Sequence, residues 1–348
     1  MNEKTGQVSI LLIYTGGTIG MVQNQETGRL EPFHFPCLLQ QIPEVREVGC
    51  AIETVQFDQP LDSADMGPES WACLARLIAD HYAAYDGFVV LHGTDTMAYT
   101  ASALSFMLEN LSKPVILTGS QLPLGMLRTD GKENLLTALE IAAAREGEFP
   151  LIEEVCIFFE NDLMRGNRTS KTGADNFNAF HSYNYPALAH AGVTIHYNRP
   201  HLYRPILRKP LKPHFQLDTN VALLKLFPGI SPRYVETVLG MEGLKGVVLE
   251  TYGSGNAPSA EWFVKLIREA VKKEIVVVNI TQCQTGSVEM QRYETGLHLQ
   301  ENGVISGYDS TTEAAITKLM FLFGLGLTPS EVKEYMQCAL AGEMSVPR

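Results

Sequence analysis

The chain has 348 residues, of which 45% are hydrophobic and 19% are charged, and its formal net charge at pH 7 is −12. This length exceeds one ordinary hydrophobic core and predicts two domains, while the composition is that of a globular protein. The acidic balance argues against a grip on nucleic acid phosphates, and the lack of basic runs in the sequence argues against an anionic membrane surface.

The first apolar run, residues 8–14, is too short for a signal-peptide core with proper flanks and far too short to span a bilayer. Six cysteines are scattered along the chain without a C-x-x-C pair, a pattern typical of thiols in a reducing compartment. We therefore expect a cytoplasmic protein that binds neither nucleic acid nor membrane.

The first half of the chain alternates apolar runs with segments of helical periodicity. Apolar runs without polar alternation predict strands that are buried on both faces, as in a parallel sheet, and they cover residues 8–14, 54–57, 87–91, 115–118 and 155–159. Helices are predicted over 97–110 and 131–145. The alternation predicts an α/β fold, with a doubly wound, mostly parallel sheet in a larger N-terminal domain over residues 1–198.

A basic, proline-rich stretch then interrupts this pattern, and because proline blocks regular strand pairing we expect residues 199–219 to be an inter-domain connector. Beyond it, residues 220–348 are predicted to form a smaller α/β domain. The expected strands there are 221–227, 246–249 and 275–279, and the expected helices are 260–272, 312–322 and 329–340.

Ligands of open parallel sheets bind where strands end, so the residues that follow the strands are the candidates. Residues 14–20 (YTGGTIG) follow the first strand. Adjacent glycines let backbone N–H groups approach an anion or an oxyanion, and a flanking threonine hydroxyl is a possible nucleophile if a base activates it. Neither a G-x-G-x-x-G nor a Walker motif is present in this stretch, although a simple turn or another nucleotide loop stays possible.

Three further polar stretches are candidates, and two of them allow two interpretations. In residues 91–96 (LHGTDT), Asp95 either caps a helix or pairs with a ligand ammonium, and Thr94 could relay a proton or position water. Residues 62–66 (DSADM) read as a turn that satisfies its own backbone. Lys171 is either a solvated surface residue or, beside a carboxylate and a hydroxyl, a proton-transfer group.

Taken together, these stretches resemble the bacterial-type L-asparaginase family, in its cytosolic type I branch. The two family signatures match residues 14–20 (YTGGTIG) and 91–97 (LHGTDTM). Supporting matches follow in family order along almost the whole chain, at 62–66 (DSADM), 118–121 (TGSQ), 128–131 (RTDG), 168–172 (RTSKT) and 252–256 (YGSGN). Two signatures with spaced partners make the resemblance highly specific.

The resemblance implies hydrolysis of L-asparagine to L-aspartate and ammonia, with no metal or organic cofactor. Thr15 matches the family's primary nucleophile, and the second catalytic group matches Thr94, Asp95 and Lys171. In family members Asp95 also holds the substrate ammonium, while Asp62 and Ser63 lie at its α-carboxylate. Asn256 matches a residue that reaches the active site of a neighbouring subunit, so a homodimer or a dimer of dimers is expected.

The chain departs from the family pattern at one catalytic position. Many members carry a catalytic tyrosine at about position 25 to 30, but residues 25–32 contain none, so the group that activates Thr15 stays open. The alternatives are a mixed asparaginase–glutaminase, an amidotransferase subunit of the same fold, and a non-catalytic amino-acid-sensing module. Glutamine is one methylene longer, a difference of only about 1–3 kcal/mol in a pocket, so the sequence does not settle the preference.

Overall fold

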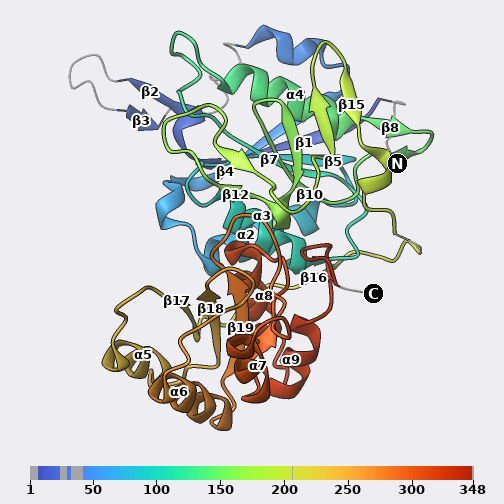
Figure 1. Cartoon of the computed structure of the whole chain (residues 1–348). Helices are drawn as coiled ribbons and strands as arrows, with labels where there is room; N and C mark the ends of the chain where they lie inside the picture. The colour runs from blue at the N-terminus through green and yellow to red at the C-terminus, as the bar shows by residue number, and fades with distance from the viewer. Residues whose placement is uncertain (1–6, 24–29, 33–41, 206, 347–348) are drawn as a thin grey trace. The chain divides into compact units, whose positions relative to one another are not determined.

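The computed structural model describes residues 7–23, 30–32, 42–205 and 207–346. The chain divides into two compact units, unit 1 over Met1–Phe215 and unit 2 over Gln216–Arg348 (Figure 1). Most of the stretch that we expected as a connector therefore belongs to unit 1. It contains the turn η5 (Arg199–His201) and the short strand β16 (Lys212–Pro213), which pairs with β6 (Leu108–Glu109).

Unit 1 is built on an eight-stranded sheet in the order β15-β14-β11-β10-β7-β5-β1-β4. The neighbours from β10 to β4 pair in parallel: β10 (Val155–Phe159), β7 (Val115–Thr118), β5 (Gly87–Leu91), β1 (Ser9–Gly16) and β4 (Ala51–Leu61). The side chains of β5, β7 and β10 are buried throughout, which explains their unbroken apolar sequences.

Helices cover both faces of this sheet, as the doubly wound prediction requires. α4 (Gly131–Ala143) packs on β1, β5, β7 and β10, whereas α3 (Met97–Met107) packs on β7 and β10 and contacts α2 (Pro68–His81). Figure 1 shows α4 on one side of the sheet and α2 with α3 on the other. α2 begins with proline at its first turn, where the missing N–H costs no hydrogen bond.

Several elements differ from the predicted ones. The predicted strand 54–57 is the middle of the longer β4, and the predicted helix 97–110 ends at Met107. The sequence analysis missed α2, and it missed three strands that extend the parallel sheet in antiparallel fashion: β11 (Asp162–Arg165), β14 (Ala189–Ala191) and β15 (Ile195–Tyr197). These strands are short and carry polar residues, so they lack the buried apolar pattern that revealed the others.

Unit 2 carries a four-stranded parallel sheet in the order β17-β18-β19-β20, namely β17 (Val221–Lys225), β18 (Gly246–Thr251), β19 (Val276–Thr281) and β20 (Ile305–Ser306). α5 (Pro232–Leu239) packs on β17, and α6 (Glu261–Lys272) packs on α5, on β19 and on α7 (Glu294–Glu301). α8 (Thr312–Gly324) packs on β17, β18 and β19, and α9 (Pro329–Met336) packs on α8 and β19.

The boundaries of the last helices follow from side-chain capping. The Thr311 hydroxyl accepts a hydrogen bond from the backbone N–H of Ala314 and so begins α8. α9 begins with a full capping box between Thr328 and Glu331. It ends at Met336, four residues before the predicted limit at position 340.

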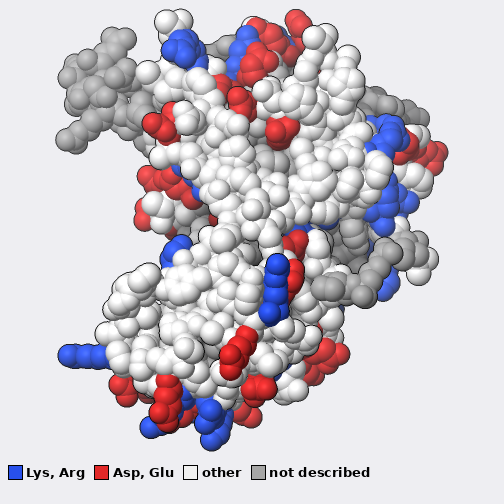
Figure 2. All heavy atoms as spheres, in the orientation of Figure 1, with Lys and Arg blue, Asp and Glu red and all other residues white. Residues whose placement is uncertain are grey.

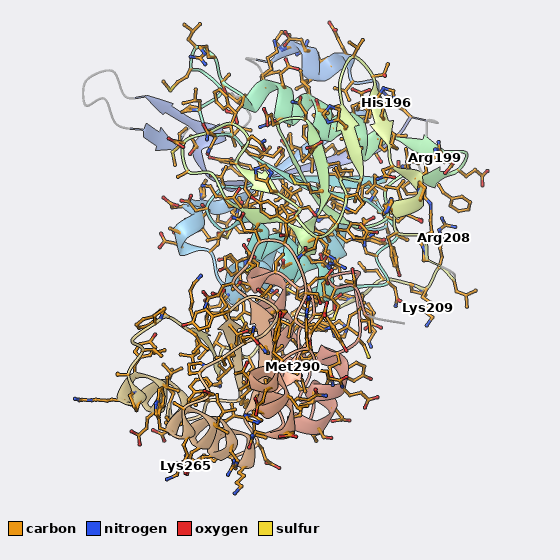
Figure 3. All side chains as sticks on the ribbon, in the orientation of Figure 1. His196, Arg199, Arg208, Lys209, Lys265 and Met290 are labelled. Carbon is orange, nitrogen blue, oxygen red and sulfur yellow. The ribbon has the colours of Figure 1, made fainter. Side chains whose placement is uncertain are left out.

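Basic side chains of the proline-rich stretch are paired with acids of unit 1. Arg199 bonds to Glu146, and Arg208 Nη2 lies 2.8 Å from Glu153 Oε1. Figure 2 shows a group of basic side chains at the right edge of unit 1, where Figure 3 labels Arg199 and Arg208. Carboxylates of unit 1 thus pair with both of these guanidinium groups.

Within the described parts of the chain, no helix combines the length and the apolar character needed to cross a bilayer.

Candidate active site

The first signature lies at the point where the sheet of unit 1 changes direction. Counted along the chain, the five parallel strands have the spatial order 2-1-3-4-5, because β4 flanks β1 on one side and β5 flanks it on the other. Connections leave the adjacent strands β1 and β5 in opposite directions, and in open α/β sheets ligands bind at the carboxyl ends of such a strand pair. Thr15 is the penultimate residue of β1, and the second signature directly follows β5.

The two glycines after Thr15 allow a backbone course that other residues would not. Gly16 has φ +131°, and a Cβ there would lie 2.0 Å from the carbonyl oxygen of Leu61. Gly17 has φ +88°, and a Cβ there would lie 2.4 Å from the Cα of Gly93. The first signature is therefore pressed against the backbone of the second, which only glycine permits.

The side chain of Thr15 is fully buried in this structure. Its Oγ1 donates a hydrogen bond to the backbone carbonyl of Leu91, at 3.0 Å, across the β1–β5 pair. The hydroxyl proton is thus held by a neutral acceptor, and the oxygen lone pairs point elsewhere. A nucleophilic role requires that a base or a departing group take this proton.

Thr94, Asp95 and Lys171 form one hydrogen-bonded set, although Lys171 is 77 residues from Thr94. Lys171 Nζ donates to Thr94 Oγ1 at 2.9 Å and to Asp95 Oδ1 at 2.6 Å. The lysine comes from β12 (Ser170–Lys171), which pairs with β13 (Phe180–His181). Thr94 Oγ1 also lies 3.4 Å from Oε1 of Gln121, a residue that the sequence analysis gave no role.

The contacts of this set argue against helix capping by Asp95 and against a solvated Lys171. The N-cap of α3 is Thr96, and the Asp95 carboxylate is engaged by the lysine instead of by backbone N–H groups. The Lys171 side chain is only 17% exposed, so it is not a solvated surface group, whereas that of Asp95 is 64% exposed and accessible to a ligand.

Asp62 and Ser63 begin the turn η3 (Ser63–Asp65), which follows β4. Asp62 Oδ1 accepts from the backbone N–H of Ala64 at 2.9 Å, as the turn interpretation predicts. The same turn is fixed to the second signature, because Thr96 Oγ1 donates to the Ser63 carbonyl at 2.6 Å. The turn thus lies against the second signature.

A buried chain of hydrogen bonds connects α2 and α3 to the second signature and supports it. Trp71 Nε1 lies 3.0 Å from Thr100 Oγ1, which lies 2.9 Å from His92 Nε2, and His92 Nδ1 lies 2.7 Å from the Gly93 carbonyl. Burial lowers the pKa of His92 to about 4, so the ring is neutral at pH 7. Its Nδ1–H must donate to the carbonyl, Nε2 accepts from Thr100, and Thr100 accepts from the indole.

Asn256 lies in unit 2, in a loop that is closed by the pairing of Tyr252 with Asn256. Its side-chain oxygen accepts a hydrogen bond from Thr295 Oγ1 at 2.9 Å. Polar side chains of β19 hold the rest of the loop, since Thr281 Oγ1 donates to the Gly253 carbonyl at 2.5 Å and Asn279 Nδ2 donates to the Gly255 carbonyl at 3.2 Å. The loop is therefore well fixed within unit 2.

The described residues do not supply the missing loop tyrosine. The segment 25–32, where family members carry it, lies largely outside the described residues. Tyr14 is adjacent to Thr15 in sequence, but it belongs to the hydrophobic core, and burial raises its pKa to about 12. A phenol with that pKa is a poor base at neutral pH.

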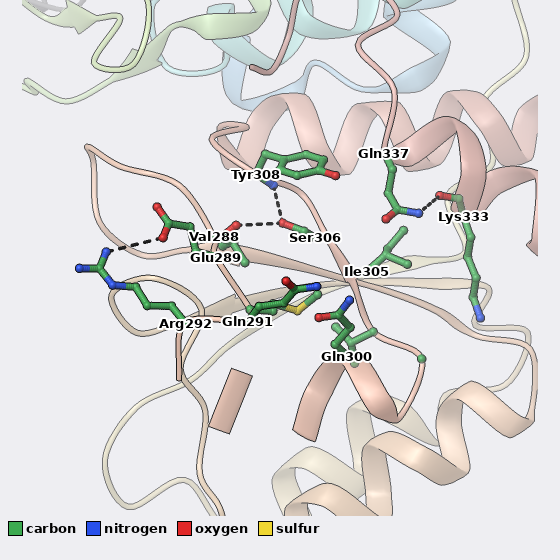
Figure 4. Close-up of a pocket in the computed structure, with 13 residues that line it drawn as sticks. Val288, Glu289, Gln291, Arg292, Gln300, Ile305, Ser306, Tyr308, Lys333 and Gln337 are labelled. Carbon is green, nitrogen blue, oxygen red and sulfur yellow. Dashed lines mark hydrogen bonds and ion pairs between the residues drawn. The ribbon is translucent and has the colours of Figure 1, made fainter. Parts of the chain in front are cut away.

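A cavity of about 910 Å³ lies in unit 2, lined mainly by residues 288–292, 303–306 and α9 (Figure 4). Some of its polar groups contact one another: Gln337 Nε2 donates to the Lys333 carbonyl at 3.1 Å, and Arg292 lies 3.7 Å from Glu289. None of the candidate site residues lines it. Across the described ranges, no group of three or more His, Cys, Asp or Glu side chains is placed to hold a metal ion.

Comparison with protein families matches both units. Residues 9–203 match the asparaginase N-terminal domain, and residues 220–336 match the glutaminase/asparaginase C-terminal domain. L-asparaginase 1 of Escherichia coli K12 is 45% identical over 97% of this chain and 98% of its own length. The 60 kDa lysophospholipase of Mus musculus is 42% identical over 97% of this chain and 63% of its own length.

The fold agrees with these sequence matches. The crystal structure of L-asparaginase I from Vibrio cholerae superimposes with a TM-score of 0.89 and 42% identity, covering 98% of this chain and all of that one. The two family domains agree with the sequence relatives and with the structural match. The chain belongs to the asparaginase family of amide-hydrolysing enzymes.

Proposed function

We propose that this chain hydrolyses L-asparagine to L-aspartate and ammonia through an ester on Thr15. The observation that carries the proposal is the bonded set of Thr94, Asp95 and Lys171 at the end of β5, the strand beside the one that bears Thr15. A hydroxyl, a carboxylate and an ammonium in contact are the groups that proton transfer during acyl transfer requires. Membership of the asparaginase family supports the same reaction.

In the first step, Thr15 Oγ1 attacks the carbon of the substrate's side-chain amide. The new C–O bond gives a tetrahedral intermediate, whose collapse breaks the C–N bond, and the hydroxyl proton leaves with ammonia. N–H groups of the glycine turn after Thr15 are suited to stabilise the oxyanion of the tetrahedral intermediate. The product of this step is a β-aspartyl ester on Thr15.

In the second step, water attacks the ester carbon and restores the Thr15 hydroxyl. We assign Thr94 with Lys171 to the movement of the water proton, because Lys171 Nζ bonds directly to the Thr94 hydroxyl. The exposed carboxylate of Asp95 is placed to hold the substrate ammonium. The Ser63 hydroxyl and the turn that Asp62 begins would then face the α-carboxylate.

Ammonia release from L-asparagine, measured over a wide concentration range, tests this function. Thr15→Ala should lower kcat by about 10³-fold or more while the fold is retained, because no ester can form. Normal activity in this variant would remove Thr15 from the mechanism. No release by the folded wild-type chain would favour a sensing module or another amide substrate.

Parallel assays with L-glutamine separate an asparaginase from a mixed asparaginase–glutaminase. One methylene changes kcat/KM by about 10- to 200-fold in a hydrophobic pocket. A ratio in that range would define an asparagine-preferring enzyme, and similar rates for both amides would define a mixed one.

The family resemblance of Asn256 leads us to propose a homodimer, or a dimer of dimers, in which Asn256 serves the site of a neighbouring subunit. The rigid seating of its loop in unit 2 supports a positional role. Mixing inactive Thr15→Ala chains with impaired Asn256→Ala chains should restore part of the activity, because some mixed sites would be complete. No recovery after confirmed subunit exchange would contradict the shared site.

We also propose that the protein acts in the cytosol. Five cysteines of the described ranges are free, at positions 50, 73, 156, 283 and 338, and three of them are exposed. Exposed free thiols persist in a reducing compartment. Fractionation of the native cells with an activity assay tests this location, and activity confined to an oxidising compartment would contradict it.

A further inference from the structure

Gln121 follows β7 and reaches the catalytic set from a third strand end. Its backbone is held firmly, because its N–H lies 3.1 and 3.0 Å from the two carboxylate oxygens of Asp130. Asp130 also accepts from the backbone N–H of Leu122 at 3.1 Å and from Asn134 Nδ2 at 3.3 Å. The side chain of Gln121 therefore projects from a backbone position that is held in place.

The neighbours of Gln121 determine which way its amide faces. Nε2 lies 2.9 Å from the Asn176 carbonyl and 3.5 Å from the Ala174 carbonyl, in the hairpin that carries Lys171. Carbonyl oxygens only accept, so the amide nitrogen must point to them and Oε1 must point to Thr94, 3.4 Å away.

This orientation of the Gln121 amide determines which hydrogen bonds the Thr94 hydroxyl donates and which it accepts. An amide oxygen has no proton to give, so Thr94 donates to Gln121. The paired ammonium of Lys171 is a donor only, so a Thr94 lone pair accepts from it. At 3.4 Å the bond to Gln121 is longer than the usual O–H···O distance of about 2.7–2.8 Å, so it orients the hydroxyl without holding its proton tightly.

We infer that Gln121 is a positioning residue for the proposed reaction: its amide oxygen orients the Thr94 hydroxyl beside Lys171, and its amide nitrogen ties the Lys171 hairpin to the same point. The inference rests on the proposed function. Because Gln121 acts through Thr94, its loss should lower kcat and leave KM nearly unchanged.

Two substitutions separate this role from a purely structural one. Gln121→Met removes both the acceptor and the donor at similar volume. Gln121→Glu keeps acceptor oxygens for Thr94 but sets a carboxylate against the Asn176 carbonyl. If orientation of Thr94 matters, Glu should be milder than Met, whereas if only the tie to the hairpin matters, Glu should be at least as harmful.

The experiment is steady-state ammonia release from L-asparagine by the full-length chain, with melting temperatures as a check on folding. We expect Gln121→Met to lower kcat about five- to tenfold, the equivalent of one hydrogen bond, with KM within about twofold of wild type. Gln121→Glu should keep kcat within about threefold. The matched control is Gln291→Met, an exposed glutamine of unit 2, which should leave kcat and KM unchanged.

Three results would overturn the role of Gln121 while the wild type remains active: an unchanged kcat in Gln121→Met, a loss confined to KM, or a Glu variant as impaired as the Met variant. Absence of wild-type activity would instead overturn the proposed function, and this inference with it. The two failures are therefore distinguishable.

Discussion

Thr100→Val is the sharpest test of the buried chain beneath the second signature. Valine has nearly the shape of threonine, so packing in α3 is preserved while the hydroxyl disappears. The indole N–H of Trp71 and Nε2 of His92 then both lose their partner in a buried site. Each orphaned group costs about 1–3 kcal/mol, so we expect a destabilisation of about 2–6 kcal/mol.

Thr100→Ser is the matched control, because it keeps the hydroxyl and removes only a methyl group, at about 1 kcal/mol. Calorimetric melting separates the two variants: at about 2–4 °C per kcal/mol for a unit of this size, about 3 kcal/mol lowers Tm by about 6–12 °C in Thr100→Val and by a few degrees in Thr100→Ser. Equal melting temperatures would refute the reasoning, since they would mean that the indole and the imidazole do not depend on this hydroxyl.

Three further predictions concern buried or catalytic polar groups. Burial lowers the folded-state pKa of His92 to about 4 from 6.5, so the unfolded state binds more protons between these values. Stability should then fall by about 3 kcal/mol as pH drops from 6.5 to 4, and urea titrations of His92→Gln should lack that part of the slope. Thr94→Val should slow hydrolysis of the ester more than its formation, so mass spectrometry should detect an added acyl mass on the protein; unaltered steady-state rates would make Thr94 a structural residue only. Lys318 and Glu343 form a fully buried ion pair at 2.6 Å, so Glu343→Gln, which leaves the lysine uncompensated, should cost about 3–5 kcal/mol in chemical unfolding, and a loss below 1 kcal/mol would show that the pair is dispensable.

The parallel core of each unit was predictable because its strands are buried on both faces. The predicted runs 87–91, 115–118 and 155–159 coincide with β5, β7 and β10. The α/β class and the smaller second unit follow from the same pattern. What the pattern lacks is strand order, because every buried run has the same composition and nothing local states which run is its neighbour.

The elements that were missed have weaker local signals. α7 has only two buried residues, and β14 and β15 place half-exposed side chains on a partly solvated edge. Their formation depends on tertiary pairing, as β14 pairs with β11 at positions set by the fold and not by an apolar run.

In the candidate site, too, the local features were predictable from the sequence, whereas the contacts between distant residues were not. The turns that carry Thr15 and Thr94 were predictable as strand ends, because glycine and short polar residues mark them. The contact of Lys171 with Thr94 spans 77 residues, and by sequence alone a lysine in that position is most often a surface group. Gln121 ends the motif at residues 118–121. The role of its amide becomes visible only in the structure, where the Asn176 carbonyl fixes which way the amide nitrogen points.

Close backbone approach explains why both signatures contain glycine, and it links local sequence to the geometry of the site. A Cβ on Gly17 would lie 2.4 Å from the Cα of Gly93, and a Cβ on Gly93 would lie 2.5 Å from Ser63 Oγ. The three loops that carry the candidate nucleophile, the Thr94 set and the Ser63 turn thus meet at Gly93, whose carbonyl accepts from the neutral ring of His92. Because the three loops contact one another in a buried region, a displacement of one loop must move the other two, so this packing sets the relative positions of Thr15, Thr94 and Ser63.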